Sequence, residues 1–141
     1  MELLGRIYVA WPHFEDEMIS VFHALLGVKE GSFLDTARLL FTAVVNQKIR
    51  IDLMRNLLER SWHNRSKGAE YDAIIDEFKQ LNDLRNKYVH GRWWTHENGD
   101  TYIQLDNSVF LPHAEYRKVT KKELQTFMNR LYALWDKLLF A

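Results

Sequence analysis

Apolar residues recur at intervals of three and four over much of this chain, which is the spacing of one face of an α-helix. The first stripe comprises Trp11, Phe14, Met18, Val21, Phe22, Leu25 and Leu26. Pro12 leaves two starting points for this helix. Either proline occupies its first position, or the helix starts earlier, near Leu4, and is kinked.

A second helical pattern runs from about Asp35, a suitable N-cap residue, almost to Trp62. Its apolar positions are Leu40, Val44, Ile51, Met54, Leu58 and Trp62. Gln47 falls within the stripe. It is either a polar residue with partners in the core or the sign of a break in the helix.

The third helical pattern follows a short linker at Ser66-Lys67-Gly68 and is strongly amphipathic. Its apolar positions are Tyr71, Ile74, Ile75, Phe78, Leu81, Leu84, Tyr88 and Val89. Gly91 lies where a glycine commonly ends a helix. We therefore expect this helix to stop at about residue 90.

Beyond it, Asn98-Gly99 lies between two short runs suited to strands, Trp93-Trp94-Thr95 and 101–105, which predicts a β-hairpin. Residues 109–112 are expected to form an irregular return. Thr120 and Glu123 match a capping box at the start of a last helix. The apolar positions of that helix are Leu124, Phe127, Leu131, Leu134, Trp135 and Leu138.

The expected fold is therefore all-α: one domain over residues 1–141, built as an up-and-down bundle of four to five helices. A small β-hairpin is inserted between the third helical pattern and the last helix. Hydrophobic residues make up 47% of the 141 residues and aromatic residues 13%, which is enough for a substantial core.

Composition narrows the function. Nineteen basic and nineteen acidic residues cancel, so any contact with nucleic acid must rest on local charge. The absence of cysteine excludes disulfides, thiolate nucleophiles and Cys-ligated zinc. No apolar run is long enough to span a bilayer, and the N-terminus lacks a secretory pattern, so we expect a cytoplasmic protein.

The most informative segment is Arg85-Asn86-Lys87-Tyr88-Val89-His90-Gly91, at the end of the third helix. A guanidinium offers phosphate a planar fork of donors, and an imidazole can move protons near neutral pH. Asn86 and His90 share a helix face, so the amide is suited to orient the imidazole. Arg85 and His90, however, are about 140° apart around an ideal helix. They meet on one phosphate only if the last turn loosens or a second chain completes the site.

This segment resembles the motif of the HEPN superfamily, small all-α domains in which Arg is followed, after four to six residues, by His. Asn, Asp or His often comes directly after the Arg. The resemblance implies a metal-independent endoribonuclease without a cofactor, whose composite site forms at a homodimer interface. Arg85 and His90 would be catalytic, with Asn86 in support.

The same resemblance implies a toxin or antiviral effector, with RNA as substrate and a neutralising antitoxin protein as partner. In one branch of the family a nucleotidyltransferase modifies a tyrosine two residues after the motif histidine. This chain departs from that branch, because the position holds Arg92.

Residues beside the motif suit RNA binding. Lys87 and Arg92 supply local positive charge, and Trp93 and Trp94 are candidates to stack on unpaired bases. We take Lys87, Arg92 and Trp93 as the expected substrate-binding residues. Such tryptophans also serve as core or interface anchors.

Other interpretations stay open. In one, Arg85 forms a surface ion pair with Asp83 or with a Glu elsewhere, and the chain is a non-catalytic helical module that binds a nucleotide or a protein partner. A metal-dependent hydrolase using His13 and Glu17 is a weaker alternative, because no HExxH motif or third ligand accompanies them.

Overall fold

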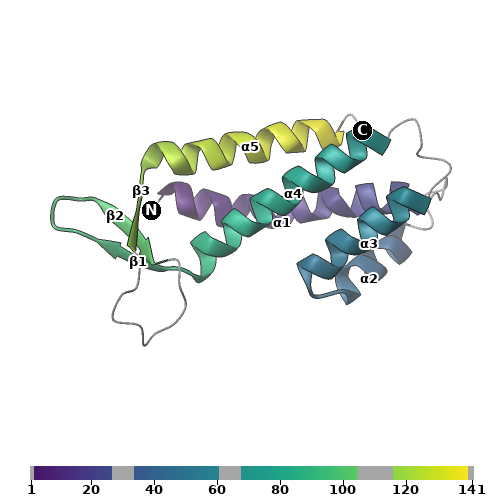
Figure 1. The fold of residues 1–141 in the computed structure, drawn as a ribbon, viewed down its shortest axis with the longest axis horizontal. Helices are drawn as coiled ribbons and strands as arrows, with labels where there is room; N and C mark the ends of the chain where they lie inside the picture. Colours follow the sequence, from purple (N-terminus) through teal and green to yellow (C-terminus); the bar gives the residue numbers. More distant parts are fainter. Residues whose placement is uncertain (1, 27–33, 61–67, 105–115, 140–141) are drawn as a thin grey trace.

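The computed structural model describes residues 2–26, 34–60, 68–104 and 116–139. Within these ranges the elements are, in order, α1 (Glu2–Leu25), α2 (Leu34–Ala43), α3 (Gln47–Arg60), α4 (Gly68–His90), β1 (Arg92–Thr95), β2 (Thr101–Gln104), β3 (Tyr116–Val119) and α5 (Lys121–Leu139). Helices α1, α4 and α5 lie along the long axis, with α4 running opposite to the other two (Figure 1). Helices α2 and α3 pack at one end, and the sheet lies at the other (Figure 1).

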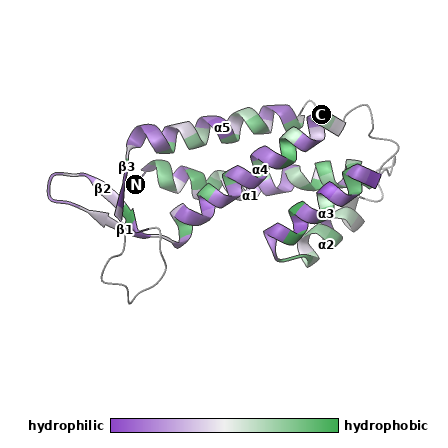
Figure 2. Cartoon of the chain, in the orientation of Figure 1, coloured by the Kyte–Doolittle hydropathy of each residue, from purple (hydrophilic) through white to green (hydrophobic). Residues whose placement is uncertain are grey.

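The prediction of a mainly helical fold is confirmed, but the molecule is not a pure bundle, because the insert is a three-stranded antiparallel sheet in the order β1-β2-β3. Polar and apolar segments alternate along the long helices (Figure 2), as expected for helices with one apolar face. None of the helices in the described ranges is both long and apolar enough to cross a lipid bilayer.

The core lies where α1 meets α4 and α5. Trp11 stacks on Phe78 of α4 with 5.9 Å between ring centroids, and Phe14 contacts the same ring at 5.6 Å. From α5, Phe127 meets the edge of Tyr88 at 5.6 Å. These aromatic contacts hold α4, the motif helix that carries Arg85, Asn86 and His90, against both α1 and α5.

Helix α1 begins well before Pro12 and continues through it as one element. Of the two starting points that the sequence allowed, the earlier one is therefore correct. Proline lacks the N–H that would bond to the carbonyl of Tyr8, so this turn has one helical hydrogen bond fewer.

The second helical pattern forms two helices, α2 and α3, separated by residues 44–46. Asn46 caps α3, because its side-chain oxygen accepts from the N–H groups of Lys48 at 2.9 Å and Ile49 at 3.3 Å. The break that Gln47 suggested is confirmed. Gln47 also has a partner, since its Nε2 donates to Glu15 Oε1 at 2.5 Å.

The predicted hairpin is confirmed, with Trp93 paired to Ile103 and Trp94 to Tyr102. Gly99 has a φ of +87°, a backbone conformation that favours glycine. The third strand, β3, was not predicted and pairs with β2. The expected irregular return at 109–112 lies outside the described residues.

Gly91 ends α4, as expected, but its φ is not positive. A Cβ at this position would lie 2.5 Å from Ile103 Cδ1 and 2.6 Å from the carbonyl oxygen of Lys87. Glycine is needed here because β2 packs so closely against the end of α4.

The start of α5 forms half of the predicted capping box. The N–H of Glu123 donates to Thr120 Oγ1 at 3.1 Å. The Glu123 carboxylate contacts Tyr88 and Arg117 instead of the backbone of Thr120. This carboxylate joins α5 to the motif helix and to the sheet.

Candidate functional site

Arg85, Asn86 and His90 lie in the last two turns of α4. Arg85 and Asn86 are partly buried, whereas His90 is exposed. Phe78 and Tyr88 anchor the same helix in the core. The motif side chains therefore project from a helix that is fixed by aromatic packing.

Two neutral groups hold the guanidinium of Arg85. Its Nη1 donates to Asn86 Oδ1 at 3.1 Å. Its Cζ lies 5.6 Å from the ring centroid of Trp11, within the range of a cation–π contact. The Trp11 indole N–H in turn donates to Glu15 Oε1 at 2.9 Å.

Arg85 differs in this respect from five other arginines of the chain. Ion pairs join Arg6 to Glu2, Arg38 to Asp16, Arg55 to Asp76, Arg117 to Glu123, and Arg130 to Glu77. Within the described part of the chain no acidic side chain pairs with Arg85, so the ion pair with Asp83 is not formed. Its charge is available to an anion from outside.

The expected Asn86–His90 hydrogen bond is not among the contacts of the described residues. Asn86 accepts from Arg85, so the amide orients the guanidinium and not the imidazole. Sequence spacing pointed to the helix-face neighbour, whereas the adjacent residue is the actual partner.

The last turn of α4 is regular. The N–H of Gly91 donates to the Lys87 carbonyl at 2.9 Å, a helical bond from residue i to residue i−4. Of the two ways to bring Arg85 and His90 together, a loosened last turn is therefore not observed. Their angular separation of about 140° stands.

Tyr88, inside the motif, is buried and belongs to a partly buried polar network. Its hydroxyl donates to Glu123 Oε1 at 3.0 Å, and Arg117 Nη1 donates to the same oxygen at 2.6 Å. Burial, followed by the hydrogen bond to Glu123, raises the pKa of Tyr88 to about 12. Tyr88 is thus a neutral anchor that ties the motif to α5 and β3.

The two tryptophans of β1 face opposite sides of the sheet. Trp93 points inward, where its Nε1 donates to the carbonyl of Tyr88 at 2.7 Å and its ring contacts that of Tyr88. Trp94 is 55% exposed. The contacts of Trp93 are those of an anchor, and a role for it in substrate binding stays a prediction.

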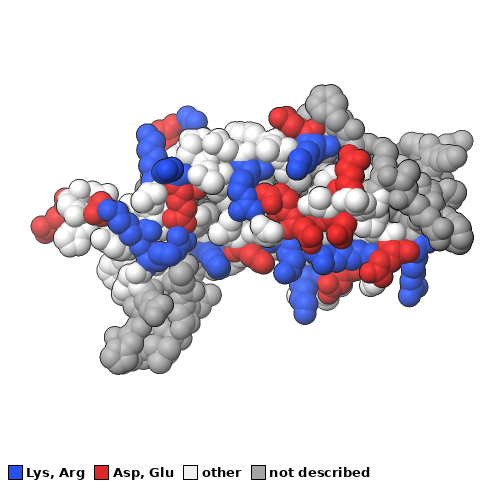
Figure 3. Space-filling model, turned by 45° about the horizontal axis from the view of Figure 1, so that its top comes forward, with Lys and Arg blue, Asp and Glu red and all other residues white. Residues whose placement is uncertain are grey.

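Lys87 and Arg92, the basic residues expected beside the motif, are both exposed. β3 and the start of α5 bring further positive charge to the same end of the molecule, in Arg117, Lys118, Lys121 and Lys122. Figure 3 shows Lys and Arg side chains over the sheet and the adjoining end of α5, with acidic side chains among them. Sequence reasoning missed this second group, because it comes about 30 residues after the motif.

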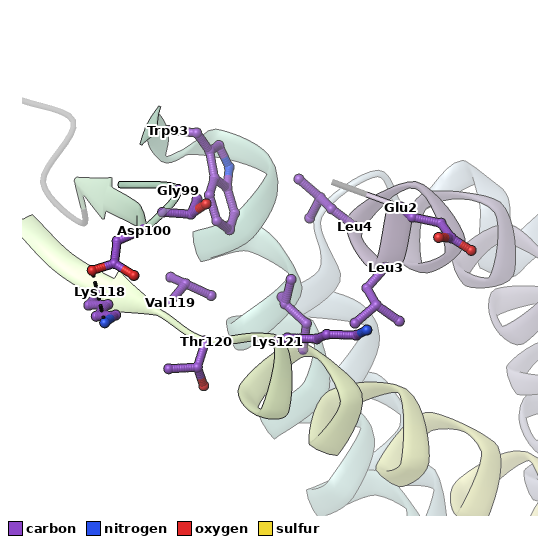
Figure 4. Close-up of a pocket in the computed structure, with 12 residues that line it drawn as sticks. Glu2, Leu3, Leu4, Trp93, Gly99, Asp100, Lys118, Val119, Thr120 and Lys121 are labelled. Atoms are coloured by element: carbon purple, nitrogen blue, oxygen red, sulfur yellow. Dashed lines mark ion pairs between the residues drawn. The ribbon is translucent and has the colours of Figure 1, made fainter. Parts of the chain in front are cut away.

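A pocket of about 560 Å³ lies between the start of α1, the sheet and the start of α5 (Figure 4). Trp93 and Val119 line it together with Leu4, and Lys118 pairs with Asp100 at its edge. Arg85, Asn86 and His90 are not part of this lining. The pocket is separate from the motif.

His13 and Glu17 do not form a metal centre with other described residues. No group of three His, Cys, Asp or Glu side chains in the described ranges is arranged to hold a metal ion. His13 stacks instead against Trp135 of α5, with 6.4 Å between the ring centroids.

No protein-family model matches this chain, and no solved structure is significantly similar to it.

Proposed function

We propose that this protein is a metal-independent endoribonuclease of the HEPN type, with a composite site at a homodimer interface. The observation that carries the proposal is the state of Arg85. Its guanidinium is held by Asn86 and Trp11, lacks an acidic partner among the described residues, and precedes the exposed His90 by five residues on α4. A positioned, unneutralised guanidinium suits a phosphodiester.

The reaction would be attack of a ribose 2′-hydroxyl on the adjacent phosphorus. One His90 takes the hydroxyl proton, and the second His90 gives a proton to the departing 5′ oxygen. Arg85 stabilises the negative charge on the remaining phosphate oxygens. The products are a 2′,3′-cyclic phosphate and a 5′-hydroxyl end.

The regular last turn of α4 supports a second chain as the source of the missing group. Exposed apolar side chains near the motif offer a surface for it. Val45 is 86% exposed and Ile49 55% exposed, and they flank Gln47. Gln47 bonds to Glu15, which also bonds to the Trp11 indole beneath Arg85. A second chain packed against Val45 and Ile49 would remove these apolar side chains from water, which favours association.

A role as a toxin or defence effector, neutralised by an antitoxin protein, rests on the motif resemblance alone. A cytoplasmic location stays a prediction from the hydropathy pattern of the sequence.

Cleavage of an RNA of mixed sequence in EDTA tests the proposal, with wild type compared with Arg85→Ala and His90→Ala. Both variants should lose at least a hundredfold in rate, since each removes a group that acts in the transition state. Arg6→Ala is the matched control, because Arg6 is exposed and paired with Glu2. Its rate should equal that of wild type.

The ends of the products and the oligomeric state complete the test. We expect 2′,3′-cyclic phosphate ends and a dimer in sedimentation. Equal cutting by wild type and His90→Ala would assign the activity to a contaminant. A wild type that does not cut RNA, together with loss of the dimer in Arg85→Ala, would favour the non-catalytic module that binds a nucleotide or a protein.

A further inference from the structure

The outer face of the sheet carries aromatic and basic side chains that the proposed reaction does not use. Side chains alternate along a strand, and the core residues Ile103 and Val119 mark the inner face. The strand register then puts the following residues on the other face: Arg92 and Trp94 from β1, Tyr102 and Gln104 from β2, Tyr116 and Lys118 from β3. Of these, Gln104 is buried and Tyr102 is partly exposed.

Two large rings dominate this face. Trp94 is 55% exposed and Tyr116 is 52% exposed, and their centroids are 6.1 Å apart. The rings meet edge to face, at 83°. A parallel pair would hide one face of each ring, whereas this perpendicular pair leaves ring faces open to a third planar group.

Positive charge lies beside the rings. Arg92 and Lys118 are exposed on the same face. Lys118 pairs with Asp100 at 3.1 Å, which offsets part of its charge. Arg92 has no acidic partner within the described ranges, so this face joins exposed rings to an unneutralised guanidinium.

We propose that the outer face of the sheet, defined by Arg92, Trp94, Tyr116 and Lys118, binds a single-stranded segment of RNA. Bases stack on Trp94 and Tyr116, and Arg92 and Lys118 contact the phosphates. This inference rests on the proposed function, because it assigns the substrate-binding surface of that enzyme. It also names single-stranded RNA as the substrate class.

Several features favour RNA over a second copy of the chain. Exposed rings between basic side chains match unpaired bases joined by phosphates, since every base has a stackable face. A dimer interface is usually depleted of lysine in its centre, whereas Lys118 lies on this face. His90 and Trp94 are also separated by at most roughly 13 Å of extended chain. Bases near the cut phosphate are thus within reach of the rings.

Binding is measured in EDTA by fluorescence anisotropy, with a 12-nucleotide RNA of mixed sequence and its duplex as probes. All proteins carry His90→Ala, which prevents cleavage. The parent protein should bind the single strand at least tenfold more tightly than the duplex. Trp94→Ala with Tyr116→Ala should weaken single-strand binding tenfold or more, because two stacking surfaces are lost.

Matched variants separate stacking from folding. Trp94→Phe with Tyr116→Phe keeps the rings and should retain binding within about threefold. Tyr132→Ala removes a ring of similar exposure (50%) from α5 and should leave binding unchanged. Arg92→Ala should weaken binding and reduce its salt dependence, whereas Arg60→Ala, on α3, should do neither.

Unchanged RNA binding by the double alanine variant, with its circular dichroism spectrum intact, would overturn the proposal. So would its conversion from dimer to monomer with RNA affinity retained, since the face would then join two copies. The proposed function can fail separately. If the wild type binds RNA through Trp94 but does not cut it, the proposed binding face stands and the proposed ribonuclease activity is wrong. RNA cleavage with an unchanged KM by Trp94→Ala with Tyr116→Ala, made in a protein that keeps His90, would retain the ribonuclease and overturn the binding face.

Discussion

The guanidinium of Arg85 lies over the indole ring of Trp11, with 5.6 Å between Cζ and the ring centroid. This contact joins the motif at the end of α4 to the first helix of the chain. Trp11 is itself fixed, because it is buried, stacks on Phe78 and donates to Glu15. The position of the motif arginine therefore depends on a residue far from it in sequence.

Trp11→Phe should lower the rate of RNA cleavage about threefold to tenfold, because the smaller ring attracts the guanidinium less strongly and cannot bond to Glu15. We expect the loss mainly in kcat, measured in EDTA well below the melting temperature. Phe22→Leu, a core change on the same helix whose ring contacts Phe41, should keep the wild-type rate. Equal rates for Trp11→Phe and wild type would refute a positioning role for Trp11.

Gly91→Ala should lower the free energy of unfolding by about 1–3 kcal/mol, because the new methyl group would overlap Ile103 and the Lys87 carbonyl. Urea unfolding measures the effect. Ile103→Val in the same protein should restore only part of the loss, since the carbonyl contact at 2.6 Å remains. Gly5→Ala is the control. Nothing lies within 4 Å of a Cβ there, so it should stabilise α1 by about 0.5–1 kcal/mol.

The raised pKa of Tyr88 predicts a loss of stability in alkali. Between pH 10 and about 12 the unfolded chain loses the phenolic proton while the folded protein keeps it. The stabilisation that the protonated Tyr88 contributes is therefore complete below pH 10. Above pH 10 the free energy of unfolding falls by up to about 1.4 kcal/mol per pH unit. Tyr88→Phe should make this decline shallower, as followed by urea midpoints at increasing pH. Tyr132→Phe, at a half-exposed site, should leave the decline as in wild type, and an equally steep decline in Tyr88→Phe would contradict the assignment.

Thr120→Ala should cost about 1 kcal/mol of stability, because it removes the oxygen that accepts from the N–H of Glu123 at the start of α5. Thr126→Ala is the matched control. The Thr126 hydroxyl bonds to the Lys122 carbonyl within the helix and caps no terminus, so its loss should cost much less. Equal thermal midpoints for the two variants would show that the cap contributes little.

The sequence predicted best what depends on neighbouring residues. Asn98-Gly99 specifies the hairpin locally, and the apolar period of α4 followed by Gly91 predicts a helix that ends at about residue 90. The break before α3 was harder to locate, because Val44 continues the apolar period while Asn46 caps a new helix. The cap at Asn46 therefore starts a new helix even though the apolar periodicity continues through Val44.

Other features depend on contacts that no local pattern contains. The strand β3 is only four residues long and gains its hydrogen bonds from β2. Trp11 was correctly predicted as an apolar helix position, but its contact with Arg85 joins helices far apart in sequence. The spacing of four residues predicted His90 as the hydrogen-bond partner of Asn86, but the partner in the structure is the guanidinium of the adjacent Arg85.

A single residue, Gly91, separates the end of α4 from the start of β1. This connection is short, and Ile103 packs so closely against it that a side chain at position 91 would not fit. We therefore expect the sheet and the last turn of α4 to move together. If RNA binds to the sheet as proposed, any displacement of the sheet on binding also changes the position of His90. Lengthening the joint by a flexible residue would then uncouple substrate capture from cleavage.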